Sequence, residues 1–209
     1  MLRSTVTNLL FTDEDEEEIR SLYWNIKEND IVIDVGCFMG SYTIPALEAG
    51  ATVYAVDPCL SYTGALCQIA KEIDKLVVVT ATLSEEGGYS PEFRTVLDES
   101  LRNTWFAPLD AVKYLTLDDL VMQYKITKLN WIKIDVEGAE LSVLRGGIKT
   151  LGRFKPQMII EDHTGVYKFV EELNIRQQCL ELLSSLYYTV ELVPYVGHAT
   201  PDRTFLICS

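Results

Sequence analysis

The segment formed by residues 131–146 joins two different hydrophobic patterns with almost no spacer. Residues 131–136 include a tryptophan, two isoleucines and a valine, a short apolar run that predicts a β-strand. Residues 139–144 then change to helical spacing. A strand that passes directly into a helix is the repeating unit of a parallel α/β sheet. The segment therefore predicts an α/β fold.

The turn inside this segment is unusually polar for a connection between buried elements. Asp135, Glu137 and Gly138 fall at the carboxyl end of the predicted strand. In an open α/β sheet, ligands bind at this edge. A simpler alternative is that Glu137 and Glu140 only place negative charge on the first turn of the helix, where the helix dipole favours it.

A second strand-turn-helix unit precedes the first one in the chain. Residues 31–35 form a β-branched strand, Gly36 and Gly40 bound a turn, and residues 41–49 follow as a predicted helix. We expect the first glycine to permit the turn and the second to let the backbone approach a ligand, which free N–H groups at the helix start would face. The third glycine of a dinucleotide fingerprint and the phosphate-binding loop of nucleotide triphosphatases are both missing.

The next predicted strand, residues 52–56, ends in Asp57, 23 residues after Asp34. An acidic residue at this place can accept hydrogen bonds from both hydroxyls of a ribose. Together with the glycine turn, it predicts a ligand that carries a ribose without phosphates.

Five motifs together resemble those of a known protein family, and they extend over most of residues 31–163. The motifs are residues 34–40, 56–58, 114–120, 132–141 and 156–161. In these motifs the chain resembles class I S-adenosylmethionine-dependent methyltransferases and, within them, the FkbM family. Two departures stand out. The family usually carries Ala-Asn after the first loop glycine, where this chain has Cys37 and Phe38, and commonly Glu where it has Asp57.

The resemblance implies a Rossmann-like, mostly parallel sheet of seven strands flanked by helices, with a C-terminal antiparallel hairpin formed by residues 187–193 and 203–208. It implies one methyltransferase domain over residues 31–209, preceded by a helical segment over residues 1–30. The cofactor would be S-adenosyl-L-methionine and the acceptor a hydroxyl on a small molecule or glycan. The implied cofactor-binding residues are Asp34, Gly36, Cys37, Phe38, Gly40, Tyr42, Asp57, Pro58, Leu83, Ser84 and Asp135.

In this fold, Asp135, Glu161 and His163 would lie beside the transferred methyl group. A sugar or alkyl hydroxyl must lose a proton as it attacks, and His163 is our first choice for the base. Alternatively, His163 only hydrogen-bonds an acidic neighbour. We expect no metal, although Asp162 could join Asp135, Glu161 and His163 in a divalent-metal site of the kind that catechol-type relatives of the fold use.

Two other functions stay open for this chain. One is a nucleoside-binding module without catalysis, and the other, less favoured, is a dehydrogenase-like oxidoreductase.

Length and charge narrow the function further. The chain has 209 residues, 48% of them hydrophobic, which suits one catalytic domain. A net charge of −13 disfavours binding to nucleic acid. No apolar stretch is long enough to span a bilayer and no signal pattern is present, so we expect a cytoplasmic protein with no membrane partner and with free cysteines.

Other patterns complete the predicted organisation. The acidic run 13–18 starts a helix that continues through Ile19, Leu22 and Trp24. We predict further helices over residues 61–73, 117–124 (with Thr116 as the N-cap) and much of 169–186, and a third strand over residues 76–83. Residues 84–112 show neither the strand nor the helix spacing of hydrophobic residues. We interpret them as a flap on the acceptor side of the site, which carries Tyr89, Phe93, Trp105 and Phe106. Alternatively, these aromatic residues only fix the loop to the body of the domain.

Overall fold

A computed structural model describes residues 14–90, 112–164, 171, 173–194 and 204–209. Its main sheet has seven strands in the order β3-β2-β1-β7-β8-β10-β9. The five strands from β3 to β8 pair in parallel, and β10 pairs antiparallel with both β8 and β9. The strands are β1 (Ile31–Val35), β2 (Thr52–Val56), β3 (Leu76–Val79), β7 (Trp131–Ile134), β8 (Gln157–Asp162), β9 (Val190–Pro194) and β10 (Thr204–Cys208). The predicted fold class is therefore confirmed.

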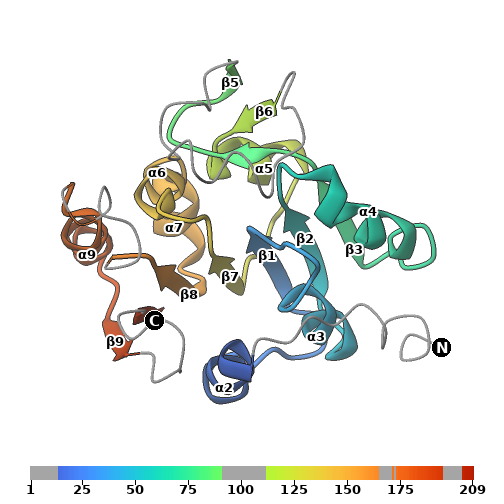
Figure 1. Cartoon of the computed structure of the whole chain (residues 1–209), viewed down its shortest axis with the longest axis horizontal. Coiled ribbons are helices and arrows are strands. Elements are labelled where there is room, and N and C mark those ends of the chain that lie inside the picture. The colour runs from blue at the N-terminus through green and yellow to red at the C-terminus, as the bar shows by residue number, and fades with distance from the viewer. Residues whose placement is uncertain (1–13, 91–111, 165–170, 172, 195–203) are drawn as a thin grey trace.

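Helices cover both faces of this sheet (Figure 1). Along β1 the side chains alternate, so that Val32 joins one buried cluster while Ile33 and Val35 join the other. Helices α2 (Glu14–Tyr23), α3 (Thr43–Glu48) and α4 (Leu60–Ile69) contribute to the first cluster. Helices α5 (Leu117–Gln123), α6 (Glu140–Arg145), α7 (Ile148–Phe154) and α9 (Ile175–Ser185) contribute to the second.

The strand register aligns the carboxyl ends of four neighbouring strands. Val35 pairs with both Val56 and Ile134, and Ile134 pairs with Ile160. The residues that follow these four positions in the chain therefore share one edge of the sheet. They are Gly36, Asp57, Asp135 and Glu161.

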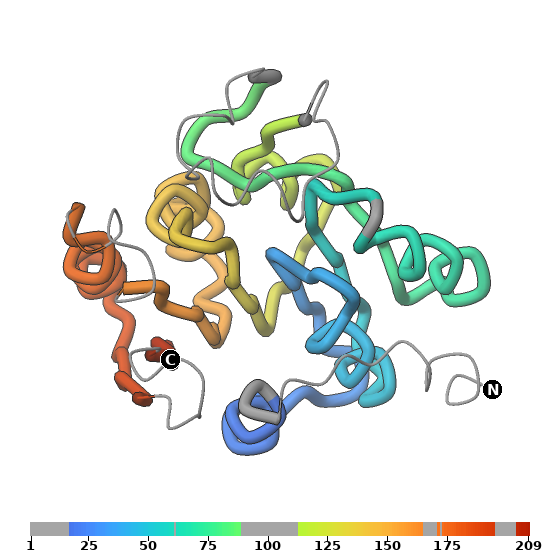
Figure 2. The backbone as a smooth tube through the Cα atoms, in the orientation of Figure 1, coloured from blue at the N-terminus to red at the C-terminus, as the bar shows by residue number. Residues whose placement is uncertain are grey.

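The third predicted strand is wrong in one respect, because residues 76–83 do not form one element. Strand β3 ends at Val79, where its partner β2 also ends. The chain then bends, and β4 (Thr82–Leu83) pairs with β6 (Val112–Leu115) in a separate small sheet that also contains β5 (Gly88–Ser90). Figure 2 traces this departure of the chain from the main sheet.

Several smaller predictions can be compared with the structure. The N-terminal helix is present and Ile19 and Trp24 are buried, but Leu22 is exposed. Thr116 caps α5 by accepting a hydrogen bond from the Asp119 amide, as predicted. Helix α9 extends from Ile175 to Ser185, within the predicted range 169–186.

In the predicted flap, Tyr89 belongs to β5, whereas Phe93, Trp105 and Phe106 lie outside the described residues. None of the helices in the described ranges combines the length and the apolar character needed to cross a bilayer.

Candidate active site

The glycine turn after β1 is fixed by contacts within the protein. Gly36 has φ +77°, and a Cβ atom added there would lie 1.7 Å from the carbonyl oxygen of Asp135. Only glycine therefore lets the ends of β1 and β7 approach this closely. The predicted tight turn at Gly36 is present.

The second glycine lies close to a neighbouring helix. A Cβ atom on Gly40 would lie 2.9 Å from Cδ2 of Leu66 in α4. The approach of a ligand to the Gly40 backbone stays a prediction. The amides of Gly36 and Cys37 donate to the Val56 carbonyl, and the Gly40 amide donates to the Cys37 carbonyl. These three N–H groups serve the turn itself. The expectation that free N–H groups at the helix start face a ligand stays a prediction.

Asp57 is the best-oriented polar group at this end of the site. Its carboxylate accepts hydrogen bonds from the Phe38 amide (3.1 Å) and the Cys59 amide (2.8 Å). Burial raises the pKa of Asp57 above its ordinary value, although the two amides act in the opposite direction. Each carboxylate oxygen has two lone pairs, so both can accept one more hydrogen bond. The two hydroxyls of a vicinal diol, such as that of a ribose, could donate these two hydrogen bonds.

An aromatic pair lies next to Asp57. Phe38 has φ +46°, a left-handed conformation, and its ring centroid is 4.4 Å from that of Tyr62 in an edge-to-face arrangement. Pro58, half-buried, follows Asp57 directly. We did not predict Tyr62 as a site residue, because nothing in its helical position distinguishes it from a packing residue.

Other predicted cofactor residues have side chains that serve the protein core. Asp34 is buried and accepts a 2.6 Å hydrogen bond from Oγ1 of Thr43. Cys37 is buried, and burial raises the pKa of its thiol well above the ordinary value. The Tyr42 ring packs edge-on against Trp24. Their predicted contacts to the cofactor stay predictions.

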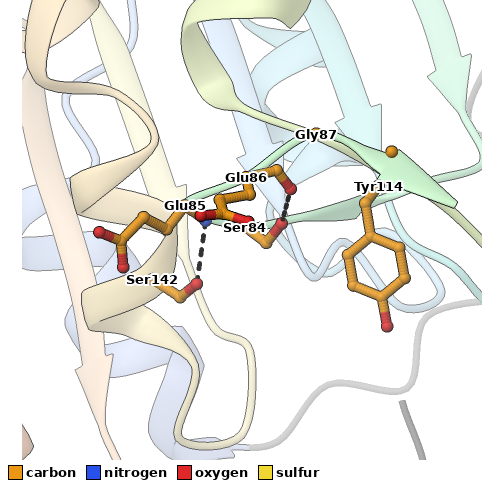
Figure 3. Close-up of a pocket in the computed structure, with 7 residues that line it drawn as sticks. Ser84, Glu85, Glu86, Gly87, Tyr114 and Ser142 are labelled. Carbon is orange, nitrogen blue, oxygen red and sulfur yellow. Dashed lines mark hydrogen bonds between the residues drawn. The ribbon is translucent and has the colours of Figure 1, made fainter. Parts of the chain in front are cut away.

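Leu83 and Ser84 lie at the small sheet. Leu83 is buried in β4 of the small sheet, and Ser84 follows it. Ser84 lines a hollow of about 450 Å³, together with Gly88 and the residues labelled in Figure 3. In that hollow Ser142 of α6 lies on one side of the Ser84–Gly87 segment and Tyr114 on the other. The predicted cofactor contacts of Leu83 and Ser84 also stay predictions.

The ends of β7 and β8 hold a buried cluster of charged groups. Lys133 is almost fully buried, with Nζ 3.3 Å from Oδ2 of Asp135 and 3.8 Å from Oε2 of Glu161. The same ammonium lies 4.7 Å from the ring centroid of Tyr42. Burial would raise the pKa of Asp135, but Lys133 and then His163 hold it below its ordinary value. Asp135 is therefore a stable carboxylate.

His163 is the second cation of this cluster. Its Nδ1 is 2.9 Å from Oε1 of Glu140, and its Nε2 is 3.2 Å from Oε2 of Glu137 and 3.7 Å from Oδ1 of Asp135. Burial alone would lower the pKa of His163, but the hydrogen bonds to Glu137 and Glu140 and the charges of Glu140 and Asp135 raise it to about 11. At neutral pH the ring is an imidazolium, which hydrogen-bonds Glu140 through Nδ1 and forms an ion pair with Glu137 through Nε2.

This geometry does not support His163 as the base, because a protonated ring has no lone pair with which to take a proton. The alternative interpretation, a hydrogen bond to an acidic neighbour, describes what His163 does. The two glutamates have different contacts. Glu140, not Glu137, accepts a hydrogen bond from a turn amide, that of Gly138 (3.0 Å), while Glu137 with φ +55° turns its carboxylate toward His163.

Only part of the possible metal set comes together. One ligand atom each from Asp135, Glu161 and His163 lie within 4.8 Å of one another. Asp162 lies on the opposite face of β8, where it pairs with Arg176 and accepts hydrogen bonds from Thr164. It is therefore not part of this group, because neighbouring side chains of a strand point to opposite faces.

Within the cluster, exposure distinguishes the groups that a ligand could touch. The side chains of Lys133, Glu140, Glu161 and His163 are at most 3% exposed, whereas Asp135 is 20% and Glu137 50% exposed. Asp135 thus presents the charge of the buried cluster at the surface of the site. We gave Lys133 no role from the sequence, yet its spacing of two residues from Asp135 was the available signal, since it places both on one face of the strand.

Comparisons with known proteins identify the family of the chain. Residues 34–188 match the FkbM methyltransferase domain. Hexuronic acid methyltransferase AglP of Haloferax volcanii is 27% identical over 154 residues, which are 73% of this chain and 64% of that protein. The chain thus spans less than two thirds of this relative.

Solved structures share the fold. A methyltransferase FkbM from Methylobacillus flagellatus KT has a TM-score of 0.59 at 14% identity, over 98% of this chain and 58% of that one. Aeropyrum pernix fibrillarin in complex with natively bound S-adenosyl-L-methionine has a TM-score of 0.51 at 10% identity, over 88% of this chain and 67% of that one. The domain match covers most of the sheet and both halves of the site, and this chain belongs to the FkbM methyltransferase family.

Proposed function

We propose that this protein transfers a methyl group from S-adenosylmethionine to a hydroxyl group of a small molecule or sugar. The observation that carries the proposal is the juxtaposition of two carboxylates at one sheet edge. Asp57 is oriented for a ribose at the end of β2, and Asp135 is held ionised and partly exposed at the end of β7. The family supports the reaction class.

The residues after β1 and β2 would hold the cofactor. Asp57 would accept hydrogen bonds from the two ribose hydroxyls, with Phe38 and Tyr62 beside it. When bound, S-adenosylmethionine supplies a methyl group that is already activated on its sulfonium. The protein therefore has to align the acceptor oxygen and exclude water.

Asp135 replaces His163 as our proposed proton acceptor. Its carboxylate would accept a hydrogen bond from the acceptor hydroxyl and take the proton as the oxygen gains the methyl group. A carboxylate whose pKa is lowered is a weak base, so the transfer would come late in the reaction. His163 and Glu161 would be positioning residues, because both are buried behind Asp135.

The charge of the site favours an uncharged acceptor. Four carboxylates (Asp135, Glu137, Glu140 and Glu161) surround two cations, Lys133 and His163, which leaves the cluster with an excess of negative charge. A second carboxylate about 4 Å from Asp135 would be repelled by about 4 kcal/mol at an effective dielectric constant of 20. The Haloferax relative is a hexuronic acid methyltransferase, which supports a sugar acceptor, but its acceptor is an acidic sugar, which the charge of this site disfavours. We propose neutral sugars or polyols over uronates.

Methyl transfer from labelled S-adenosylmethionine to matched acceptors tests this proposal. We expect label in neutral sugars or polyols and less in the corresponding uronates. A preference for uronates would overturn the charge argument. Cofactor binding without transfer to any hydroxylated acceptor would favour a nucleoside-binding module that lacks catalysis.

A further inference from the structure

The environment of Lys133 bears on how this site is neutralised. Lysine side chains are rarely buried without a partner, because an ammonium loses its hydration there. Lys133 is 1% exposed and lies on the same face of β7 as Asp135. Its Nζ is 3.3 Å from one carboxylate and 3.8 Å from another, and the Tyr42 ring lies on a further side.

These contacts involve two of the three residues that could ligate a metal. Asp135 and Glu161 place carboxylate oxygens near His163, in a set compatible with a divalent ion. However, Asp135 and Glu161 each already have an ammonium within 4 Å. The third possible ligand, His163, has Nε2 3.2 Å from Oε2 of Glu137, so that nitrogen already faces a carboxylate.

We propose that Lys133 takes the place of the divalent ion used by catechol-type methyltransferases of this fold, and that this site works without a metal. The ammonium compensates the charges of Asp135 and Glu161 and fixes the direction in which Asp135 faces the acceptor. Lys133 is a positioning residue, since Asp135 and not Lys133 reaches the surface of the site. The inference rests on the proposed function for the role of Asp135, but the absence of a metal can be tested without any turnover.

The proposal predicts a gain of metal binding when the ammonium is removed. In Lys133→Met, the side chain keeps its length and loses its charge, which leaves His163, 3.7 Å from Asp135 and 3.9 Å from Glu161, as the remaining cation beside these two carboxylates. These carboxylates should then bind Mn²⁺, a hard divalent ion that takes oxygen ligands. Lys113→Met is the matched control, because Lys113 is in the small sheet, where it bonds to Gln123.

Calorimetric titration with MnCl₂ of the wild type, Lys133→Met and Lys113→Met tests this inference. We expect Lys133→Met to bind one Mn²⁺ at least tenfold more tightly than the other two proteins, and Asp135→Asn added to Lys133→Met to abolish that gain. Stoichiometric Mn²⁺ binding by the wild type that Asp135→Asn removes would overturn the proposal, and so would a Lys133→Met protein that folds, by circular dichroism, without gaining affinity. If Lys133→Met does not fold, the wild-type titration alone decides. Failure of the proposed function would instead appear as a lack of methyl transfer, whatever the result with Mn²⁺.

Discussion

The ends of β1 and β2 and the ends of β7 and β8 share one sheet edge but are built in different ways. After β1 and β2, backbone amides and a left-handed turn define the shape, and Asp57 is oriented by two N–H groups. After β7 and β8, side-chain charges define the arrangement, with Lys133 and His163 placed among carboxylates. The first region has a fixed form that suits binding. The second has a fixed electrostatic state that suits chemistry.

This difference predicts that substitutions in the two regions fail in different ways. Changes to the backbone turn should damage folding or binding, whereas changes to the charged cluster should damage turnover while the cofactor still binds. The predictions below test that division, beginning with the largest effect.

Gly36→Val should destabilise the fold by about 3 kcal/mol or more, because its Cβ would overlap the Asp135 carbonyl and φ is +77°. Urea unfolding measures this change. Gly64→Ala in α4 is the control, since a Cβ there meets nothing within 4 Å, and helix propensity should raise stability by roughly 0.5–1 kcal/mol. A Gly36→Val protein as stable as the wild type would show that the two strand ends are not in contact.

Asp135→Asn should lower the single-turnover rate of methyl transfer by about 10²–10⁴-fold, because an amide cannot take the acceptor proton. Glu181→Gln on the outer surface of α9 is a charge-matched control and should keep the wild-type rate. Full activity of Asp135→Asn would leave alignment alone to explain the reaction.

His163 should affect the dependence of stability on pH. Its folded-state pKa of about 11 lies above the ordinary value of 6.5 for an unfolded histidine, so its contribution is complete below pH 6.5 and is lost as pH rises toward 11. In that window the free energy of unfolding of the wild type, relative to His163→Gln, should fall by up to about 1.4 kcal/mol per pH unit. Urea unfolding of both proteins at pH 6, 8 and 10 measures the difference. A difference that does not change with pH would mean that the ring is not an imidazolium.

The sequence predicted much of the fold because its signals are local. Apolar runs and the glycine turn identified β1, β2 and β7, and parallel pairing then placed Asp57, Asp135 and Glu161 at one edge. The break after Val79 was missed, because the run of β-branched residues continues past the point where the partner strand ends.

The electrostatic state of the site depends on contacts that no local pattern contains. His163 is protonated because Glu140, 23 residues earlier, and Glu137, in a left-handed turn, meet its two nitrogens. The resemblance to a family supplied these residues, but it did not supply their partners. For the same reason the sequence identified Asp135 as a candidate and left the role of Lys133 unseen.

Titration of S-adenosylmethionine into three proteins tests the central division of the site most directly. The wild type should bind one equivalent, Asp57→Ala should bind more weakly by roughly 1.5–3 kcal/mol because it loses charge-assisted hydrogen bonds to the ribose, and Asp135→Asn should bind within about threefold of the wild type. Wild-type affinity in Asp57→Ala would contradict the account, as would an equal loss in Asp135→Asn, because binding would then not belong to the ends of β1 and β2.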